Sequence, residues 1–215
     1  MEKLPITLCV ITRNSEGAIG PMLKKHRDFI KEILVVDQDS TDNTRAEAEE
    51  VADMVFTRKA KGTADPDRNW LFSIAKNPWV LYLDDDEYLD EELIKVLPEL
   101  IDDGIDIYWL KTRNLVDGVD IKEILGEDPH PRLFKKGAVT YKDQQTNLDH
   151  TFPEAHPHAM VAYINHYMVH DRTLDKVIKS NRRRNAIATP EQTRMQEGFI
   201  KSVQDYLEKK KWEIA

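Results

Sequence analysis

The segment Trp79-Val80-Leu81-Tyr82-Leu83-Asp84-Asp85-Asp86-Glu87 joins an apolar run directly to four consecutive acids. An apolar run of this length is typical of a strand that is buried on both faces of a parallel sheet. In open α/β sheets, ligands bind just beyond the carboxyl ends of such strands. The segment therefore predicts an α/β fold with a ligand site at the end of this strand.

The four acids have the chemistry of a metal site. If the backbone stays extended, Asp84 and Asp86 project to one side and Asp85 to the other, so two carboxylates converge. Carboxylate oxygens of this kind favour Mg²⁺ or Mn²⁺. The alternative is that acids after a strand begin a helix, as Asp90 and Glu91 are expected to do. Helix capping does not explain the tetrad, whose mutual repulsion requires a cation or buried hydrogen bonds.

The chain has 215 residues, a formal net charge of -8 and a pI near 5.4. Its length suits one α/β domain with an appendage. Its acidity argues against a nucleic-acid partner, because proteins that bind phosphate backbones usually carry a basic excess. Cys9 lies in an apolar segment and is expected to be a buried small side chain. The sequence shows neither a signal peptide nor an apolar stretch near the ~20 residues of a spanning helix, which predicts a cytoplasmic protein.

Strands and helices alternate along the first half of the chain. We expect strands at 6–11, 33–36, 54–57, 79–83 and 107–111, and helices at 19–30, 44–51, 68–76 and 89–101. The second of these helices is expected to open with a capping box, Thr44-x-x-Glu47. Repeated β–α units predict a doubly wound, mostly parallel sheet.

The pattern loosens from about Asp117 onward. Short β-like segments occur at 132–134, 139–141 and 160–164, and two helices are expected at 174–188 and 191–212. We therefore expect an α/β domain over residues 1–170. Residues 171–215 are expected to form a helical appendage packed on that domain.

Polar clusters also follow the first two expected strands. They are Thr12-Arg13-Asn14-Ser15-Glu16 and Asp37-Gln38-Asp39-Ser40-Thr41-Asp42. Either cluster alone is explained by a turn with side-chain hydrogen bonds. Because three strands of the sheet end in such residues, we expect the clusters to outline one ligand cleft.

Four segments together resemble the inverting family 2 glycosyltransferases of GT-A fold, closest to the lipopolysaccharide-core glucosyltransferase type. They are Val10-Ile11-Thr12-Arg13-Asn14, the segment 36–44, Arg68-Asn69-Trp70 and the segment 83–87. The resemblance covers about residues 5–100. It implies a metal-dependent hexosyltransferase that uses a nucleotide-diphosphate sugar, with UDP as the expected nucleotide. Gln38 and Asp39 depart from the commoner pattern, which has an acid and a glycine at these positions.

The resemblance also implies roles for individual residues. Asp84 and Asp86 correspond to the DxD pair that binds Mn²⁺ or Mg²⁺, with Glu87 supporting them. The residues expected to contact the donor nucleotide are Thr12, Asn14, Asp37, Asp39, Arg68, Asp84 and Asp85. A metal held here would stabilise the negative charge that develops on the leaving diphosphate. The acceptor is expected to be a carbohydrate, a lipid-linked molecule or a protein.

An inverting transfer needs a base that takes the proton of the acceptor hydroxyl. By the resemblance this base lies in the second half, where Asp143 and Asp149 are alternatives and the usual ED or HE pair is missing. Both are equally explained as polar loop residues. His166 and His170 resemble the late histidine motif of the family and are candidate metal ligands, although a hydrogen-bonded structural histidine is the alternative for each.

The C-terminal helices are locally basic, with Arg182-Arg183-Arg184 and Lys209-Lys210-Lys211. These residues are expected to form solvated helix faces, and the alternative is peripheral contact with anionic lipid.

Two other function classes stay open. The spacing of Asp37, Asp39 and Thr41 fits the DxDxT motif of haloacid-dehalogenase phosphatases, although that nucleophile normally ends the first strand. The other class is a non-catalytic nucleotide-sugar-binding module, which would have the same cleft and would not need the ED or HE pair. A Rossmann dehydrogenase is disfavoured because no GxGxxG follows any strand.

Overall fold

The computed structural model describes residues 2–60, 65–126, 129–142, 153–185 and 190–214. The chain divides into two compact units, which are Met1–Lys111 with Pro129–Met168, and Thr112–Asp128 with Val169–Ala215. The C-terminal segment of the second unit begins at Val169. Residues 112–128 join it, and the sequence did not indicate this. In the described ranges we find no helix whose length and apolar character would let it cross a bilayer.

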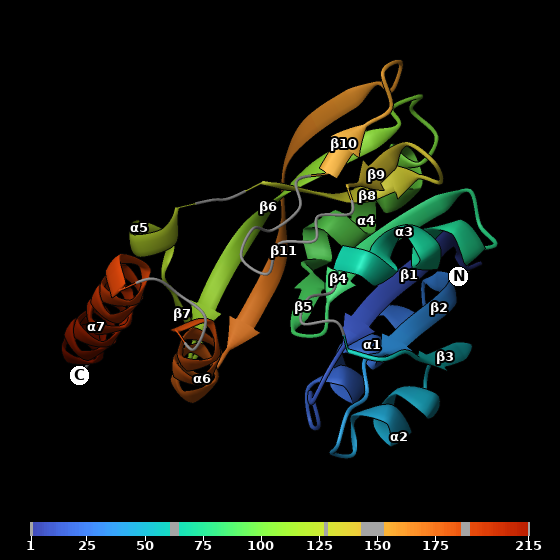
Figure 1. Cartoon of the computed structure of the whole chain (residues 1–215). Helices are drawn as coiled ribbons and strands as arrows, with labels where there is room; N and C mark the ends of the chain where they lie inside the picture. The colour runs from blue at the N-terminus through green and yellow to red at the C-terminus, as the bar shows by residue number, and fades with distance from the viewer. Residues whose placement is uncertain (1, 61–64, 127–128, 143–152, 186–189, 215) are drawn as a thin grey trace. The chain divides into compact units, whose positions relative to one another are not determined.

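The first unit contains most of the regular structure (Figure 1). Its elements are β1 (Leu4–Thr12), α1 (Ile19–Arg27), β2 (Ile30–Asp37), α2 (Thr44–Glu49), β3 (Met54–Thr57), α3 (Asp65–Ile74), β4 (Trp79–Asp84), β5 (Glu87–Leu89), α4 (Glu91–Leu100), β8 (His130–Lys135), β9 (Val139–Tyr141) and β10 (Pro153–Ala155). Strands β6 (Ile107–Val116) and β11 (Val161–Arg172) contribute residues to both units.

The second unit is mainly helical. It contains β7 (Val119–Asp120), α5 (Lys122–Leu125), α6 (Leu174–Asn185) and α7 (Pro190–Ile214). Its own small core comprises five buried residues, which are Val116, Ile121, Val177, Val203 and Leu207. The two expected C-terminal helices are therefore present, and each forms part of a unit with its own core.

Within the described residues the main sheet has nine strands, in the order β3-β2-β1-β4-β8-β6-β11-β5, with β7 paired to β6. The pairs β1–β2, β1–β4 and β2–β3 are parallel. The pairs β4–β8 and β6–β8 are antiparallel. The expected α/β fold is confirmed, and its parallel part is built from the four strands that the sequence showed most clearly.

Strand β1 is buried on both faces, as its apolar run predicts. Ile6, Leu8 and Val10 pack into one core layer together with residues of α1 and α4. Cys9 and Ile11 point to the opposite layer, which contains residues of α3. This alternation places helices on both sides of the sheet, and it confirms that Cys9 is a buried small side chain.

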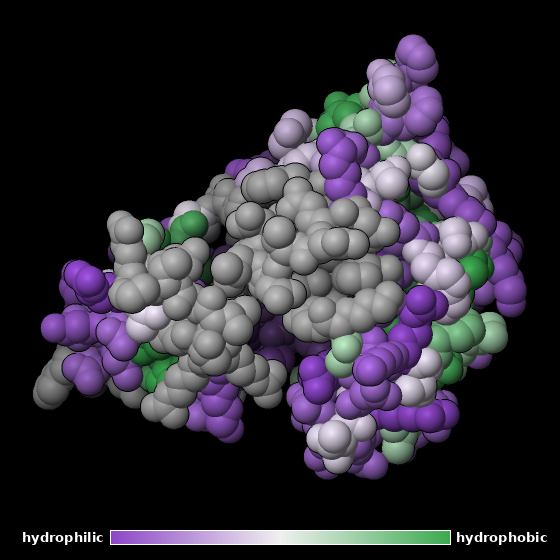
Figure 2. All heavy atoms as spheres, in the orientation of Figure 1, coloured by the Kyte–Doolittle hydropathy of each residue, from purple (hydrophilic) through white to green (hydrophobic). Residues whose placement is uncertain are grey.

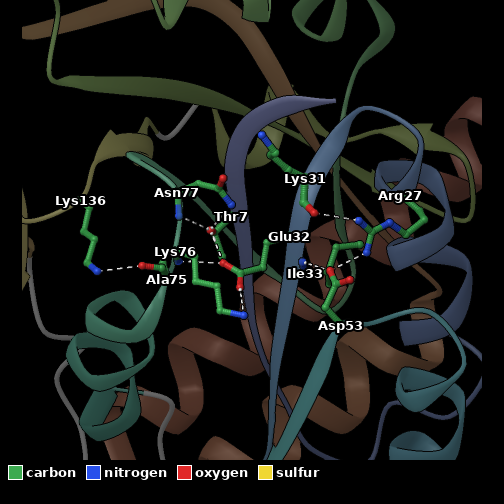
Figure 3. Close-up of polar contacts among 10 residues, drawn as sticks. All are labelled: Thr7, Arg27, Lys31, Glu32, Ile33, Asp53, Ala75, Lys76, Asn77 and Lys136. Atoms are coloured by element: carbon green, nitrogen blue, oxygen red, sulfur yellow. Dashed lines mark hydrogen bonds and ion pairs between the residues drawn. The ribbon is translucent and has the colours of Figure 1, made fainter. Parts of the chain in front are cut away.

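A buried polar network links the first two strands to the start of β4. The carboxylate of Glu32 accepts hydrogen bonds from the Thr7 hydroxyl at 2.7 Å and the Lys76 amide at 2.8 Å (Figure 3). Glu32 is only 6% exposed. Asn77 also donates its side-chain amide to the Thr7 hydroxyl, at 3.0 Å. This network fixes the loop that leads into β4.

Helix ends differ from the sequence prediction at one place and agree at another. The expected capping box at Thr44 is wrong, because Asn43 is the N-cap and makes no side-chain cap hydrogen bond. Thr44 instead accepts a hydrogen bond from the Ser15 amide, and Glu47 accepts one from Gly17. Both side chains therefore fix the loop after β1 rather than the start of α2. Asp90 caps α4 as expected, because its side chain accepts from the Leu93 amide at 2.8 Å.

Candidate functional site

The carboxyl ends of the three central parallel strands meet at one edge of the sheet. In the pairing register, Thr12 of β1 lies beside Asp37 of β2, and Ile11 of β1 lies beside Asp84 of β4. Hydrophilic side chains predominate on the surface near α1 and α2, next to this edge (Figure 2). The expected convergence of the polar clusters is therefore present in the structure.

The acidic tetrad forms a turn, so the extended backbone that would make Asp84 and Asp86 converge is not present. Strand β4 ends at Asp84, the chain turns at Asp85 and Asp86, and β5 begins at Glu87. The buried carboxylate of Glu87 causes the turn to close, because it accepts a hydrogen bond from the Asp84 amide at 2.8 Å. The Asp85 carboxylate consequently points to the loop after β1, whereas the carboxylates of Asp84 and Glu87 share one arginine, Arg132.

The Asp85 carboxylate holds the loop after β1. Its Oδ2 atom accepts hydrogen bonds from the Thr12 hydroxyl, at 2.7 Å, and from the Ser15 hydroxyl. Thr12 and Ser15 are both buried. Ser15 was not predicted as a site residue, although it lies in the polar cluster that follows β1. This contact joins two of the three strand ends through side chains.

A buried arginine on β8 pairs with the acidic turn. Arg132 donates from Nη2 to Oε1 of Glu87 at 2.8 Å and to Oδ2 of Asp84 at 3.4 Å. Burial acts to lower the pKa of Arg132, but the neighbouring carboxylates outweigh burial and raise it. Arg132 is therefore a permanent positive charge. Sequence reasoning missed it, although an arginine inside the apolar strand Pro131-Arg132-Leu133-Phe134 signals a buried charge that needs an acidic partner.

Arg68 of α3 lies close to the same acids. It donates from Nε to the Tyr82 hydroxyl at 3.0 Å, and Tyr82 donates to Oδ1 of Asp84 at 3.4 Å. The Arg68 guanidinium also stacks on the Tyr141 ring, with 4.5 Å between the guanidinium carbon and the ring centroid. Burial raises the pKa of Tyr82, so its hydroxyl keeps its proton. Tyr82 and Tyr141 thus fix the expected nucleotide-contacting arginine beside the turn.

Asp37 provides a buried carboxylate with unused acceptor capacity. The residue is 2% exposed, and its Oδ2 accepts from the Ser40 amide at 3.3 Å. Its Oδ1 is buried and has no hydrogen-bond partner among the residues that the structure describes. A buried acceptor of this kind is expected to be satisfied by a water or a ligand.

The loop after β2 is fixed by Asn14 and contains a strained residue. The side-chain oxygen of Asn14 accepts from the Thr41 amide at 2.9 Å, and the backbone amide of Asn14 donates to the Ser40 hydroxyl at 2.9 Å. Asp39 is exposed and has a left-handed backbone with φ of 53°. This conformation favours glycine, which accounts for the glycine in the commoner pattern. Asp39 therefore takes a turn conformation at the edge of the site.

Gln38, the other departure from the commoner pattern, pairs with an acidic residue of α3. Its side-chain amide donates to Oδ2 of Asp67 at 2.8 Å. The fully buried Asp67 also forms an ion pair with Arg58, with 2.7 Å between Nε and Oδ1. Arg58 in turn stacks on Trp70. A neutral amide thus occupies the usual acid position because it pairs with an acid from another element.

A buried histidine of α1 contacts the C-terminal end of β5. His26 contacts the Met22 carbonyl through Nδ1 at 2.8 Å, and its Nε2 accepts from the Leu89 amide at 3.3 Å. Burial lowers the pKa of His26 to about 4. The ring is therefore neutral at pH 7, and it links α1 to the strand that carries Glu87.

The expected metal ligands fit a divalent cation only together with oxygens from a ligand. Asp84 and Asp86 are both partly exposed at the turn. Across the described ranges, no group of three or more His, Cys, Asp and Glu residues is placed to hold a metal ion. Mg²⁺ is commonly bound by one or two carboxylates plus substrate phosphates, so this donor set suits an ion that binds with a diphosphate.

The remaining expected site residues are less well defined. His166 and His170 both lie on β11, four positions apart, so their backbones are separated by roughly 13 Å along the strand. One ion could contact only one of them. Asp143 and Asp149 lie outside the described residues.

Comparisons of sequence agree with the family resemblance that the motifs show. A sequence model of glycosyl transferase family 2 matches residues 7–162. An uncharacterized glycosyltransferase of Rickettsia felis is 33% identical over 93 residues, which are 43% of this chain and 32% of that protein. The chain thus spans about a third of that relative's length. The lipopolysaccharide core biosynthesis glycosyltransferase LpsC of Rhizobium meliloti is 28% identical over 160 residues, which cover 71% of this chain and 58% of LpsC.

A comparison of structures agrees with the fold. The structure of S. aureus TarS 1-349 in complex with UDP-GlcNAc has a TM-score of 0.54 and 18% sequence identity. The match covers 77% of this chain and 58% of the TarS 1-349 chain. Its GT-A fold confirms the fold that the sequence motifs implied.

Proposed function

The chain belongs to glycosyl transferase family 2, and from this premise we propose that it transfers a sugar from a UDP-sugar to an acceptor hydroxyl with inversion. The acidic turn, the end of β1 and the end of β2 form the donor site in this proposal. Mn²⁺ or Mg²⁺ is the proposed cofactor, held by Asp84 and Asp86.

The observation that carries the proposal is the buried Oδ1 of Asp37, which has no hydrogen-bond partner within the described ranges. Leaving a buried acceptor without a donor costs about 1–3 kcal/mol. The imide N–H of uracil is a neutral donor that would satisfy this oxygen. Thr12 lies beside Asp37 in the register, so the same strand ends would border the nucleoside. The TarS structure with UDP-GlcNAc supports a uridine donor for this fold.

The other described residues position the diphosphate. Arg68, held by the Tyr82 hydroxyl and the Tyr141 ring, is proposed to contact the diphosphate and to stabilise its developing charge. Asp85 holds the β1 loop against the turn, so that loop and turn would bind the donor as one surface. A bound divalent ion would supply Lewis-acid stabilisation of the leaving group. Glu87 supports the turn by accepting the Asp84 amide.

The acceptor half of the reaction depends on the second half of the chain. Asp143 or Asp149 is proposed to take the proton of the acceptor hydroxyl. His166 or His170 remains a proposed further ligand of the metal or diphosphate. The similarity to LpsC supports a glycolipid or polysaccharide acceptor. Peripheral contact with a cytosolic membrane face through the basic helices α6 and α7 would suit such an acceptor.

The phosphatase alternative is not retained. Asp37 would be its nucleophile, yet it ends β2 rather than the first strand. Asp39 would be its acid, yet it is exposed on a left-handed turn. The binding-module alternative makes a different prediction from the transferase, because it binds donor without turnover.

The proposal is tested by incubating the protein with UDP-sugars and GDP-sugars, with Mn²⁺ and with EDTA, and measuring release of the nucleoside diphosphate. We expect metal-dependent release from one or more UDP-sugars, and loss of release in Asp86→Ala. Donor binding without release from any sugar, in the presence of glycolipid acceptors, would support the binding module. Hydrolysis of p-nitrophenyl phosphate would restore the phosphatase.

A further inference from the structure

The buried, positively charged side chain of Arg132, on β8, lies against the acidic turn. Three of its carboxylates are positioned by protein groups, and the buried guanidinium of Arg132 contacts two of these, Glu87 and Asp84. The Glu87 and Arg132 side chains are only 3% and 8% exposed, whereas the Asp84 side chain is 43% exposed. The carboxylate of Asp84, a proposed metal ligand, is thus accessible from solvent on one side and contacts the positive charge of Arg132 on its buried side.

We propose that Arg132 lowers the affinity of the turn for free divalent cations, so that the ion binds tightly only together with the diphosphate of the donor. This inference rests on the proposed function, because it takes the turn as the metal site. Arg132 acts here as a positioning and charge-balancing residue. It does not touch the reacting atoms.

The contact distance sets the size of the effect. Nη2 of Arg132 lies 3.4 Å from Oδ2 of Asp84. Metal–oxygen distances are about 2.1 Å, so an ion on this oxygen would lie at most about 5.5 Å from Nη2. Charges of +1 and +2 at this separation repel enough to weaken binding about tenfold, even at the dielectric constant of water. A diphosphate brings negative charge that offsets this repulsion.

Glu87 gives the means to separate charge from structure. It pairs with Arg132 at 2.8 Å, so the two side chains form a compact pair of opposite charge beside the metal site. Arg132→Gln removes the positive charge, Glu87→Gln removes a negative charge, and the double variant restores the original net charge. A purely structural role would make all three variants bind metal more weakly.

The experiment measures Mn²⁺ binding without nucleotide, from the electron paramagnetic resonance signal of the free ion. Relative to wild type, we expect about tenfold tighter binding in Arg132→Gln, weaker binding in Glu87→Gln, and an affinity between those of the two single variants in the double variant. Arg132→Lys keeps the charge and is expected to resemble wild type. Circular dichroism and thermal unfolding report whether each variant is folded.

Folded Arg132→Gln that binds Mn²⁺ no tighter than wild type would overturn the inference. Removing one partner of a buried ion pair can prevent folding. If Arg132→Gln does not fold, the comparison of Glu87→Gln with the double variant decides, because equal Mn²⁺ affinity in these two would overturn it. Titration of wild type with UDP is a separate arm. No UDP binding there would contradict the proposed donor site, whereas the Mn²⁺ comparison tests Arg132 itself.

Discussion

Protonation of His26 should destabilise the protein in mild acid. The imidazole is buried between α1 and β5, where it contacts the Met22 carbonyl and accepts from the Leu89 amide. Burial lowers its pKa to about 4, the Met22 contact opposes this shift, and Lys25 adds to it. In the unfolded chain the pKa is about 6.5. The perturbation is therefore a fall in pH through the range between these two values.

The sign and size follow from proton linkage. Between pH 6.5 and 4 the unfolded chain binds a proton that the folded protein does not, so the free energy of unfolding decreases as the pH falls. The stability that neutral His26 contributes is fully present above pH 6.5 and is lost by about pH 4. A shift of this size corresponds to about 3 kcal/mol in total, of which about 2 kcal/mol should be lost by pH 4.5.

Urea unfolding, followed by tryptophan fluorescence at pH 7.0, 6.0, 5.0 and 4.5, measures the effect. His26→Gln is the matched variant, because glutamine cannot titrate and carries both a donor and an acceptor. We expect the variant to be less stable at pH 7 and to lose about 2 kcal/mol less than wild type on going to pH 4.5. Equal losses in the two proteins would refute the argument that His26 is held neutral.

Other predictions follow from single contacts. Asp39→Gly should stabilise the protein by about 0.5–1 kcal/mol in urea unfolding, because it relieves a left-handed residue, and a destabilised variant would contradict this. Glu32→Ala should cost about 2–3 kcal/mol by stranding the buried Thr7 hydroxyl, and a near-neutral change would show that the network is unimportant. Asp143→Ala and Asp149→Ala should both keep UDP binding, measured by calorimetry, and only the variant that lacks the base should lose turnover. Wild-type turnover in either removes that aspartate.

The parallel half of the fold could be predicted because its strands are continuous apolar runs. Strand β1 is buried on both faces, and its sequence contains no polar alternation that would obscure it. Strand β11 shows the opposite case. The strand runs from Val161 to Arg172, whereas only residues 160–164 were expected. The prediction fell short because exposed and half-buried residues alternate along the first half of the strand and include polar side chains. Such a strand is stabilised by partners that are distant in sequence, and these leave no local signal.

The position of the site at the strand ends could be predicted, but the arrangement of its side chains could not. Strand ends located Thr12, Asp37 and Asp84, and the pairing register brings them together. The turn at Asp85 was not predictable from local pattern, because the Glu87 carboxylate that accepts from the Asp84 amide is itself paired with a buried residue 45 positions away in sequence. The same long-range pairing explains why Arg132 was missed.

Calorimetric titration with UDP and with GDP, in Mn²⁺ and in EDTA, tests the central claim most directly. Wild type is compared with Asp37→Ala and with Asp28→Ala, a control at an exposed aspartate beyond the end of α1. We expect wild type and the control to bind UDP with Mn²⁺, to bind it more weakly in EDTA, and to bind GDP weakly or not at all. Asp37→Ala should lose at least tenfold in UDP affinity, the order expected when a buried acceptor loses its hydrogen bond. Absence of nucleotide binding to wild type, or unchanged UDP affinity in folded Asp37→Ala, would contradict the account.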